Sequence, residues 1–281
     1  MANVIITADS TCDLSREQRE RYGVIISPLY VRVGEDERRD GIDIDAQELF
    51  RQVESSGTLP KTAACSVDDY LALWRPYAEA GKEIVHINLS SAMSSCHQNA
   101  CLAAQELKGV YVIDSLNLST GSGLLAVEAS ILAEQGKTGQ EIYDILLEKR
   151  ERLNVSFVLD TMEYLAKGGR CSSVAAFAAG VLRLRLCIEV KNGKMDVCKK
   201  YRGKMNAVLR QYVHERLQAA GEVETERIFI THTGNDAETV EELKQAILEE
   251  KPFAEILESN AGCTVSAHCG PKCLGILFFV K

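Results

Sequence analysis

Serine residues cluster where a predicted strand gives way to a predicted helix. The loop 89–95 joins an apolar run at 84–89 to a helical pattern at 94–107. The first turn of a helix has unpaired N–H groups and about half a positive charge, so serine hydroxyls there suit a carboxylate or a phosphate. Ser91 and Ser94 are the candidate ligand-binding residues. Ordinary N-capping by Ser94 explains the same pattern without a ligand, and both interpretations stay open.

Two further loops carry groups that could bind a ligand. Thr62 follows Pro60 in a predicted loop, ahead of a helix that Ser66 is expected to cap. A loop threonine with no special role is the alternative. The segment 9–13 follows the first predicted strand, where open α/β sheets place ligand-facing loops. Its two aspartates are also typical turn formers, and we favour this structural role.

The segment 167–210 is strongly basic within an acidic protein. The chain has a net charge of −8, but this segment has eleven basic residues against Glu189 and Asp196, a local charge of +9. A solvated hairpin face is one explanation, and we favour a docking surface for an acidic partner or a phosphate. The basic residues are Lys167, Arg170, Arg183, Arg185, Lys191, Lys194, Lys199, Lys200, Arg202, Lys204 and Arg210.

His268 stands out among five histidines, because it lies close to glycine and proline ahead of a final apolar run. We expect it in a turn-rich loop. Together with Cys263, Cys269 and Cys273 it could bind zinc. The chain has no CxxC pair, however, and small buried apolar side chains are the more ordinary role of such cysteines. We therefore predict no metal and no cofactor.

Composition and absent motifs exclude several classes of function. A net charge of −8 disfavours nucleic acid and anionic membranes as partners. The sequence has neither a targeting segment nor an apolar run of about 20 residues, so we expect a cytoplasmic protein without membrane insertion. P-loop, nucleophile-elbow, HExxH and dinucleotide-binding patterns are also missing from the sequence, so we assign no catalytic residue.

The pattern of elements predicts two α/β domains, 1–153 and 154–281, with a ligand cleft between them. Short β-branched runs alternate with amphipathic helical segments in the first half. In the second half, Asn192-Gly193 between apolar-alternating runs predicts a β-hairpin, because both residues tolerate positive φ.

Six motifs, in order along nearly the whole chain, resemble those of the DegV family. Each is weak alone, but six in order are specific. They are Asp9-Ser10-Thr11-Cys12-Asp13-Leu14; Pro60-Lys61-Thr62 with Ser66; Ser90-Ser91-Ala92-Met93-Ser94; Asp114-Ser115 with Ser119, Gly121 and Gly123; Leu165-Ala166-Lys167-Gly168-Gly169-Arg170; and His268-Cys269-Gly270-Pro271.

The resemblance implies a bacterial fatty-acid-binding protein that is not itself an enzyme. Such proteins present the carboxylate of a long-chain fatty acid to a separate fatty acid kinase, which makes acyl phosphate. By the same resemblance, Thr62 and Ser94, with Ser91 nearby, hydrogen-bond the carboxylate. Arg170 and His268 lie near the head group.

The family pattern places Arg202 on the surface that docks the kinase, and we add Lys167 to it. Three departures from that pattern, at Ala63, Ala92 with Ser95, and Cys187, put the preferred chain length in doubt. An enzyme that acts on a small phosphate or acyl substrate, using His268 and the basic segment 167–210, is the alternative function.

Overall fold

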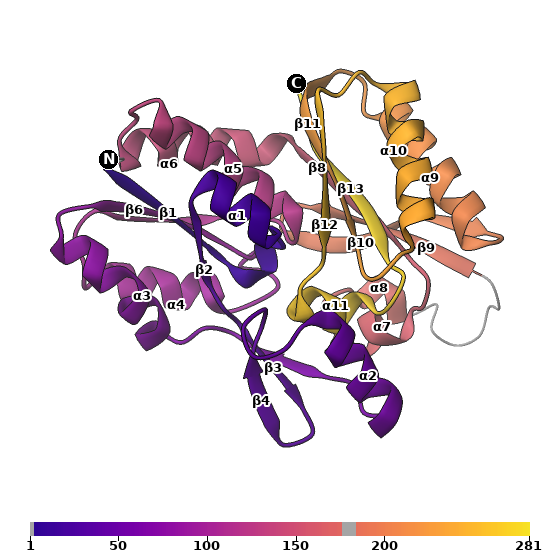
Figure 1. Ribbon diagram of the computed structural model, residues 1–281, viewed down its shortest axis with the longest axis horizontal. Helices are drawn as coiled ribbons and strands as arrows, with labels where there is room; N and C mark the ends of the chain where they lie inside the picture. The colour runs from indigo at the N-terminus through magenta and orange to yellow at the C-terminus, as the bar shows by residue number, and fades with distance from the viewer. Residues whose placement is uncertain (1–2, 176–183) are drawn as a thin grey trace.

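In the computed structural model, which describes residues 3–175 and 184–281, the N-terminal domain is built on a four-stranded parallel sheet (Figure 1). Such sheets are buried on both faces, which explains the continuous apolar runs that the sequence shows here. The strand order is β2-β1-β6-β7, with β1 at Val4–Asp9, β2 at Val24–Ser27, β6 at Glu83–Asn88 and β7 at Val110–Asp114.

Helices cover both faces of this sheet (Figure 1). The predicted cap at Ser66 is confirmed, because its hydroxyl accepts the backbone N–H of Asp69. No helix in the described parts of the chain is long and apolar enough to cross a membrane. One face has α3 (Val67–Glu79) and α4 (Cys96–Ala104); the other has α1 (Arg16–Tyr22), α5 (Thr120–Glu134) and α6 (Gly139–Lys149); the 3-10 helices are η1 (Ser10–Cys12) and η2 (Arg150–Arg152).

A small antiparallel sheet extends from the N-terminal domain. It has the order β4-β3-β5, with β3 at Tyr30–Val33, β4 at Asp36–Arg39 and β5 at Lys61–Ala63, and α2 (Ala46–Ser56) contacts β3. Thr62 therefore lies in a strand, paired with Val31, and not in the predicted loop. Three residues are too few to show the period-two alternation that identifies a strand in a sequence.

The C-terminal domain is built on a six-stranded mixed sheet, with α9 (Met205–Ala219) and α10 (Ala237–Glu250) beside it (Figure 1). The predicted hairpin is confirmed, because Asn192 and Gly193 form its turn at φ 50° and 77°. The strand order is β10-β9-β8-β13-β11-β12, with β8 at Leu153–Leu159, β9 at Leu184–Lys191, β10 at Lys194–Arg202, β11 at Val223–His232, β12 at Glu255–Asn260 and β13 at Leu274–Val280.

Three short helices of the C-terminal domain lie near the N-terminal domain: α7 (Glu163–Gly168), α8 (Ser172–Ala175) and α11 (Cys263–Cys269) (Figure 1). His268 lies in α11, so its predicted position in a loop is wrong. The glycine that suggested a turn comes after the helix, where Gly270 at φ 72° ends it. The start of α11 is capped by the carboxylates of Asp13 and Asp40, which are distant in sequence, so a local sequence pattern cannot reveal this helix.

One apolar core continues from the N-terminal sheet into the six-stranded sheet. It includes Ile6 and Val85 of the parallel sheet, Leu125 of α5, and Phe157 and Leu277 of the other sheet. Helix α5 contacts β8 and β13, which explains why its sequence is apolar almost all round. The two domains therefore meet through core residues. The boundary between residues 153 and 154 falls at the start of β8 and stays a prediction.

Candidate functional site

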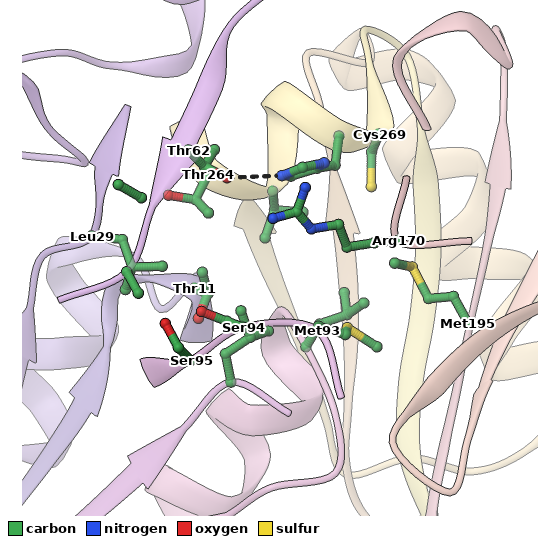
Figure 2. Close-up of a pocket in the computed structure, with 16 residues that line it drawn as sticks. Thr11, Leu29, Thr62, Met93, Ser94, Ser95, Arg170, Met195, Thr264 and Cys269 are labelled. Carbon is green, nitrogen blue, oxygen red and sulfur yellow. Dashed lines mark hydrogen bonds between the residues drawn. The ribbon is translucent and has the colours of Figure 1, made fainter. Parts of the chain in front are cut away.

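A cavity of about 230 Å³ lies where β5, the loop 89–95, α11 and the residues after α7 meet. Figure 2 shows polar and apolar side chains around it. Its lining consists of Thr11, Leu29, Thr62, Ala63, Ala64, Leu89, Met93, Ser94, Ser95, Leu118, Arg170, Met195, Thr264, Val265, His268 and Cys269. Four of the predicted ligand-binding residues, Thr62, Ser94, Arg170 and His268, therefore come together from distant parts of the sequence.

Thr62 and His268 form the link between the two domains at this cavity. The Thr62 Oγ1 lies 3.0 Å from the His268 Nε2, and Figure 2 shows this hydrogen bond. Burial, together with the nearby positive charge of Arg170, lowers the pKa of His268 to about 4. The imidazole is therefore neutral at physiological pH, and one of its nitrogens lacks a proton.

Ser94 lies in the loop that joins β6 to α4. Its hydroxyl accepts the backbone N–H of Cys96 at 3.3 Å and donates to the Cys96 Sγ at 3.2 Å. Helix α4 begins two residues later than predicted and its N-cap is Ser95, so the interpretation of Ser94 as the N-cap is wrong.

Asp9 holds the start of this loop, because its Oδ2 accepts the N–H of Leu89 at 2.9 Å. Asp9 is 1% exposed and does not line the cavity. Its role is structural, but its carboxylate accepts from Tyr70 and Leu89 of distant segments and does not form the local turn that we favoured.

Arg170 is the only charged side chain among the described residues that line the cavity. It follows α7, and its Nη1 donates to the Gly168 carbonyl at 2.7 Å. Gly168 packs so closely against His268 that a Cβ at position 168 would collide with the imidazole Nδ1. The glycine of this motif therefore permits the close approach of Arg170 and His268 to the same cavity.

Two buried hydroxyls in the cavity wall were missed by the sequence analysis. The Oγ1 atoms of Thr11 and Thr264 have no hydrogen-bond partner among the described residues, although these side chains are only 1% and 4% exposed. An unsatisfied buried polar group costs free energy. Both hydroxyls are therefore suited to a polar ligand atom or a water molecule. No local signal marked Thr264, because its position depends on the distant caps of α11.

Three of the lining side chains contain sulfur. Met195 and Cys269 lie on the side from which Arg170 extends, and Met93 lies next to Ser94 (Figure 2). A second, much smaller cavity of about 20 Å³ shares Leu118, Val265 and Cys269 with the first. Its other walls come from β8, β11 and β13 and from Ser119, Thr233, Ala261 and Cys273. The main cavity therefore adjoins a small gap in the packing against the six-stranded sheet.

The remaining predicted site residues lie outside the cavity. Ser91 is exposed, and its backbone N–H donates to the Asp114 carboxylate at 3.1 Å. Lys167 is exposed and forms an ion pair with Glu163 at 2.8 Å. Arg202 is exposed at the end of β10. The ligand-binding role of Ser91 and the docking roles of Lys167 and Arg202 stay predictions.

Several positive charges of the basic segment 167–210 are paired with acidic residues from other parts of the chain. Arg185 pairs with Asp160 at 2.9 Å, and Lys199 pairs with Glu215 at 2.7 Å. Both acids lie outside the segment, so a count along the chain could not include them. Arg183 lies outside the described residues. The Arg202 guanidinium forms no ion pair within the described parts of the chain, so its charge is available at the surface.

The cysteines do not assemble a metal centre in the described residues. No three histidine, cysteine or acidic side chains in 3–175 and 184–281 are grouped as metal ligands. All ten cysteines are free thiols, and most are buried. The structure therefore offers no support for the zinc site considered from Cys263, His268, Cys269 and Cys273.

Comparisons with known proteins agree with these motifs. A DegV domain-containing protein of Clostridium perfringens is 32% identical over 100% of this chain and 99% of its own length. A Thermotoga maritima protein named "Fatty acid-binding protein" is 29% identical over 97% of this chain and 96% of its own length. A Thermus thermophilus DegV family structure, described by its fatty acid binding, superposes with a TM-score of 0.90 at 29% identity and covers 99% of both chains. The family model described as "Uncharacterised protein, DegV family" matches residues 3–281, and this chain belongs to that family.

Proposed function

We propose that this protein binds a long-chain fatty acid in the cavity between its two domains. The observation that carries the proposal is that one cavity brings hydroxyls, an imidazole and a guanidinium together with apolar side chains such as Met93, Met195 and Leu118. A fatty acid has the same two chemistries, with an anionic head and an apolar tail. The fatty-acid-binding descriptions of the Thermotoga and Thermus relatives support this ligand class.

Thr62 and Ser94 bind the carboxylate in this proposal. We assign the proton of the neutral His268 to Nε2, so that it donates to the Thr62 Oγ1 and leaves the threonine hydroxyl proton free to donate to a carboxylate oxygen. Ser94 donates from the opposite segment, and Arg170 supplies a positive charge. Charge-assisted hydrogen bonds contribute about 1.5–3 kcal/mol each before desolvation is counted.

The tail extends along Met93 and Met195 toward the second cavity. Each buried methylene contributes about 0.8 kcal/mol, so the tail dominates the affinity while the head group provides selectivity. Ligand pockets usually measure about 300–1,000 Å³. The cavity of about 230 Å³ is smaller, so a long tail displaces the shared wall at Leu118, Val265 and Cys269. The thioether side chains of Met93 and Met195, which line only the first cavity, can adapt to the tail as it passes them.

The protein presents the bound acid to a separate kinase and catalyses no reaction alone. This part of the proposal comes from the family resemblance. Arg170 is exposed at the cavity, and Arg202 and Lys167 are exposed on the C-terminal domain, where they can meet an acidic partner. We place this activity in the cytoplasm, and the ten free thiols support a reducing compartment.

The binding proposal is tested by solvent extraction of the purified protein, followed by mass spectrometry and titration with palmitate and hexadecanol. We expect an extracted fatty acid and selective binding of the acid. The double variant Thr62→Ala/Ser94→Ala should weaken palmitate binding by about 30-fold, the equivalent of ~2 kcal/mol, and leave hexadecanol binding unchanged. Thr58→Ala, on an exposed loop, is the control hydroxyl deletion. An empty protein that refuses added palmitate would refute the proposal.

The kinase role needs a separate reaction. Palmitate-loaded protein, ATP and the catalytic subunit of a bacterial fatty acid kinase should together produce acyl phosphate, while either protein alone should produce none. Lys167→Ala/Arg202→Ala should slow this reaction without changing palmitate affinity. Turnover by this protein alone would instead favour an enzyme that uses His268 and the basic segment.

A further inference from the structure

Helix α11 starts at a carboxylate that belongs to the other domain. The Asp40 Oδ1 accepts the backbone N–H of Cys263 at 2.7 Å, and the Oδ2 accepts that of Thr264 at 3.1 Å. Asp40 is 2% exposed. The first N–H groups of a helix have no partner within the helix, so this contact from a distant segment satisfies them.

Asp40 also contacts two more segments of the cavity wall, one through its carboxylate and one through its backbone N–H. The Ser10 hydroxyl donates to the Asp40 Oδ2 at 3.0 Å and accepts the N–H of Leu29 at 3.1 Å. The Asp40 N–H donates to the Leu29 carbonyl at 2.8 Å. Leu29 lines the cavity, and Ser10 directly precedes Thr11, which also lines it. Asp40 therefore connects three wall segments without lining the cavity itself.

Helix α11 has little independent means of keeping its position. It contains seven residues, and isolated helices of this length are unstable in water. Four of the seven, Thr264, Val265, His268 and Cys269, line the cavity. A displacement of α11 would consequently move both polar and apolar residues of the site.

We propose that Asp40 is a positioning residue for the ligand site, which fixes α11 against the N-terminal domain so that His268 meets Thr62. The effect on palmitate rests on the proposed function, whereas the effect on α11 does not. Asp40 acts through the backbone of α11 and makes no contact with the ligand.

A second carboxyl group beside it provides a matched comparison. The Asp13 Oδ1 accepts the N–H of Gly262 at 2.8 Å, and its Oδ2 accepts the Ser119 hydroxyl at 2.6 Å. Burial raises the pKa of Asp13 to about 8, so the neutral acid is accommodated there. The two aspartates therefore accept from successive N–H groups of the same turn. Asp13 accepts one of these N–H groups and one hydroxyl, whereas Asp40 accepts two of them and one hydroxyl.

The two aspartates respond differently to replacement by asparagine. At position 13, the amide oxygen can accept from Gly262 while the amide nitrogen donates to the rotatable Ser119 hydroxyl. At position 40, both carboxylate oxygens accept a backbone N–H. Whichever way an asparagine is oriented there, its NH₂ group faces the N–H of Cys263 or of Thr264, and a buried donor loses its acceptor.

The test is an NMR pH titration of the His268 imidazole in the ligand-free protein, with the resonance assigned through His268→Gln. Asp40→Asn should raise the pKa of His268 from about 4 toward its ordinary value of 6.5, because α11 no longer buries the ring beside Arg170. Asp13→Asn should change it far less. In palmitate titrations, Asp40→Asn should weaken binding by about tenfold and Asp13→Asn by about threefold or less.

Ser10→Ala provides a milder variant in case Asp40→Asn does not fold, since it removes one donor to the carboxylate and the acceptor of the Leu29 N–H but leaves both contacts of Asp40 with α11 in place. It should raise the pKa of His268 in the same direction by a smaller amount. An unchanged His268 titration in the folded Asp40 variant, or in Ser10→Ala if that variant alone folds, would overturn the proposal, as would an equal effect of Asp13→Asn. Because the titration needs no ligand, it stays decisive even if the wild-type protein does not bind palmitate.

Discussion

The polar and the apolar residues that line the cavity are held in different ways. Hydrogen bonds fix polar side chains from separate segments, as between Thr62 and His268. Among the apolar residues, Met93 and Met195 have flexible side chains that need no particular orientation. A carboxylate requires donors in defined directions, whereas a tail requires only apolar volume. The comparison indicates that selectivity and capacity can be changed separately.

Enlarging a side chain in the wall that the two cavities share should produce the largest effect. Val265→Phe places a ring at the shared wall, so we expect palmitate affinity to fall by about 100-fold, because three to four methylenes at about 0.8 kcal/mol each lose their place. Octanoate, which is too short to reach the wall, should lose less than about threefold. Isothermal titration with both acids measures the contrast. Equal losses for the two acids would mean that the tail does not pass Val265.

The free energy of unfolding should fall in acid because His268 is buried at the cavity. The unfolded chain binds a proton at His268 near pH 6.5, whereas the folded protein binds it only near pH 4. Stability from this group is therefore fully present above pH 6.5 and falls as the pH drops toward 4, by about 2 kcal/mol between pH 7 and pH 5. Urea unfolding at the two pH values should show this loss in the wild type and a smaller loss in His268→Gln. Identical losses would contradict the assigned burial of the ring.

Removing the positive charge at the cavity should have the smallest effect, because Arg170 is exposed and screened. We expect Arg170→Met to weaken palmitate binding by about fivefold at low salt and by less at 1 M salt. Arg75→Met, an exposed charge on α3, is the control and should show no change. A salt-independent loss would indicate that the Arg170 side chain contributes by packing.

Much of the site was predictable because its residues carry local signals. Ser94 follows a strand, Thr62 follows a proline, and the motif around Arg170 contains the glycines that its geometry needs. The family resemblance then favoured a ligand-binding role for Thr62 and Ser94, which the spacing of the residues alone had left open. In the same way, the Asn192-Gly193 turn was predictable because positive φ restricts the choice of residue.

The features that were missed depend on contacts distant in sequence. Helix α11 was taken for a loop because its caps come from Asp13 and Asp40, more than two hundred residues earlier. The unpartnered hydroxyls of Thr11 and Thr264 become visible only once the cavity between the domains is formed. The basic segment lost part of its charge to acids that fold back onto it, such as Glu215.

The continuous apolar core through α5 has a consequence for cargo exchange. Separating the two domains would expose Leu125, Phe157 and Leu277 to water, at a cost of roughly 1.5–3 kcal/mol for each side chain. A wide opening of the two domains is therefore unfavourable. Under the proposed function, a fatty acid would therefore enter and leave by local rearrangement at the rim of the cavity, and its exchange in free solution would be slow.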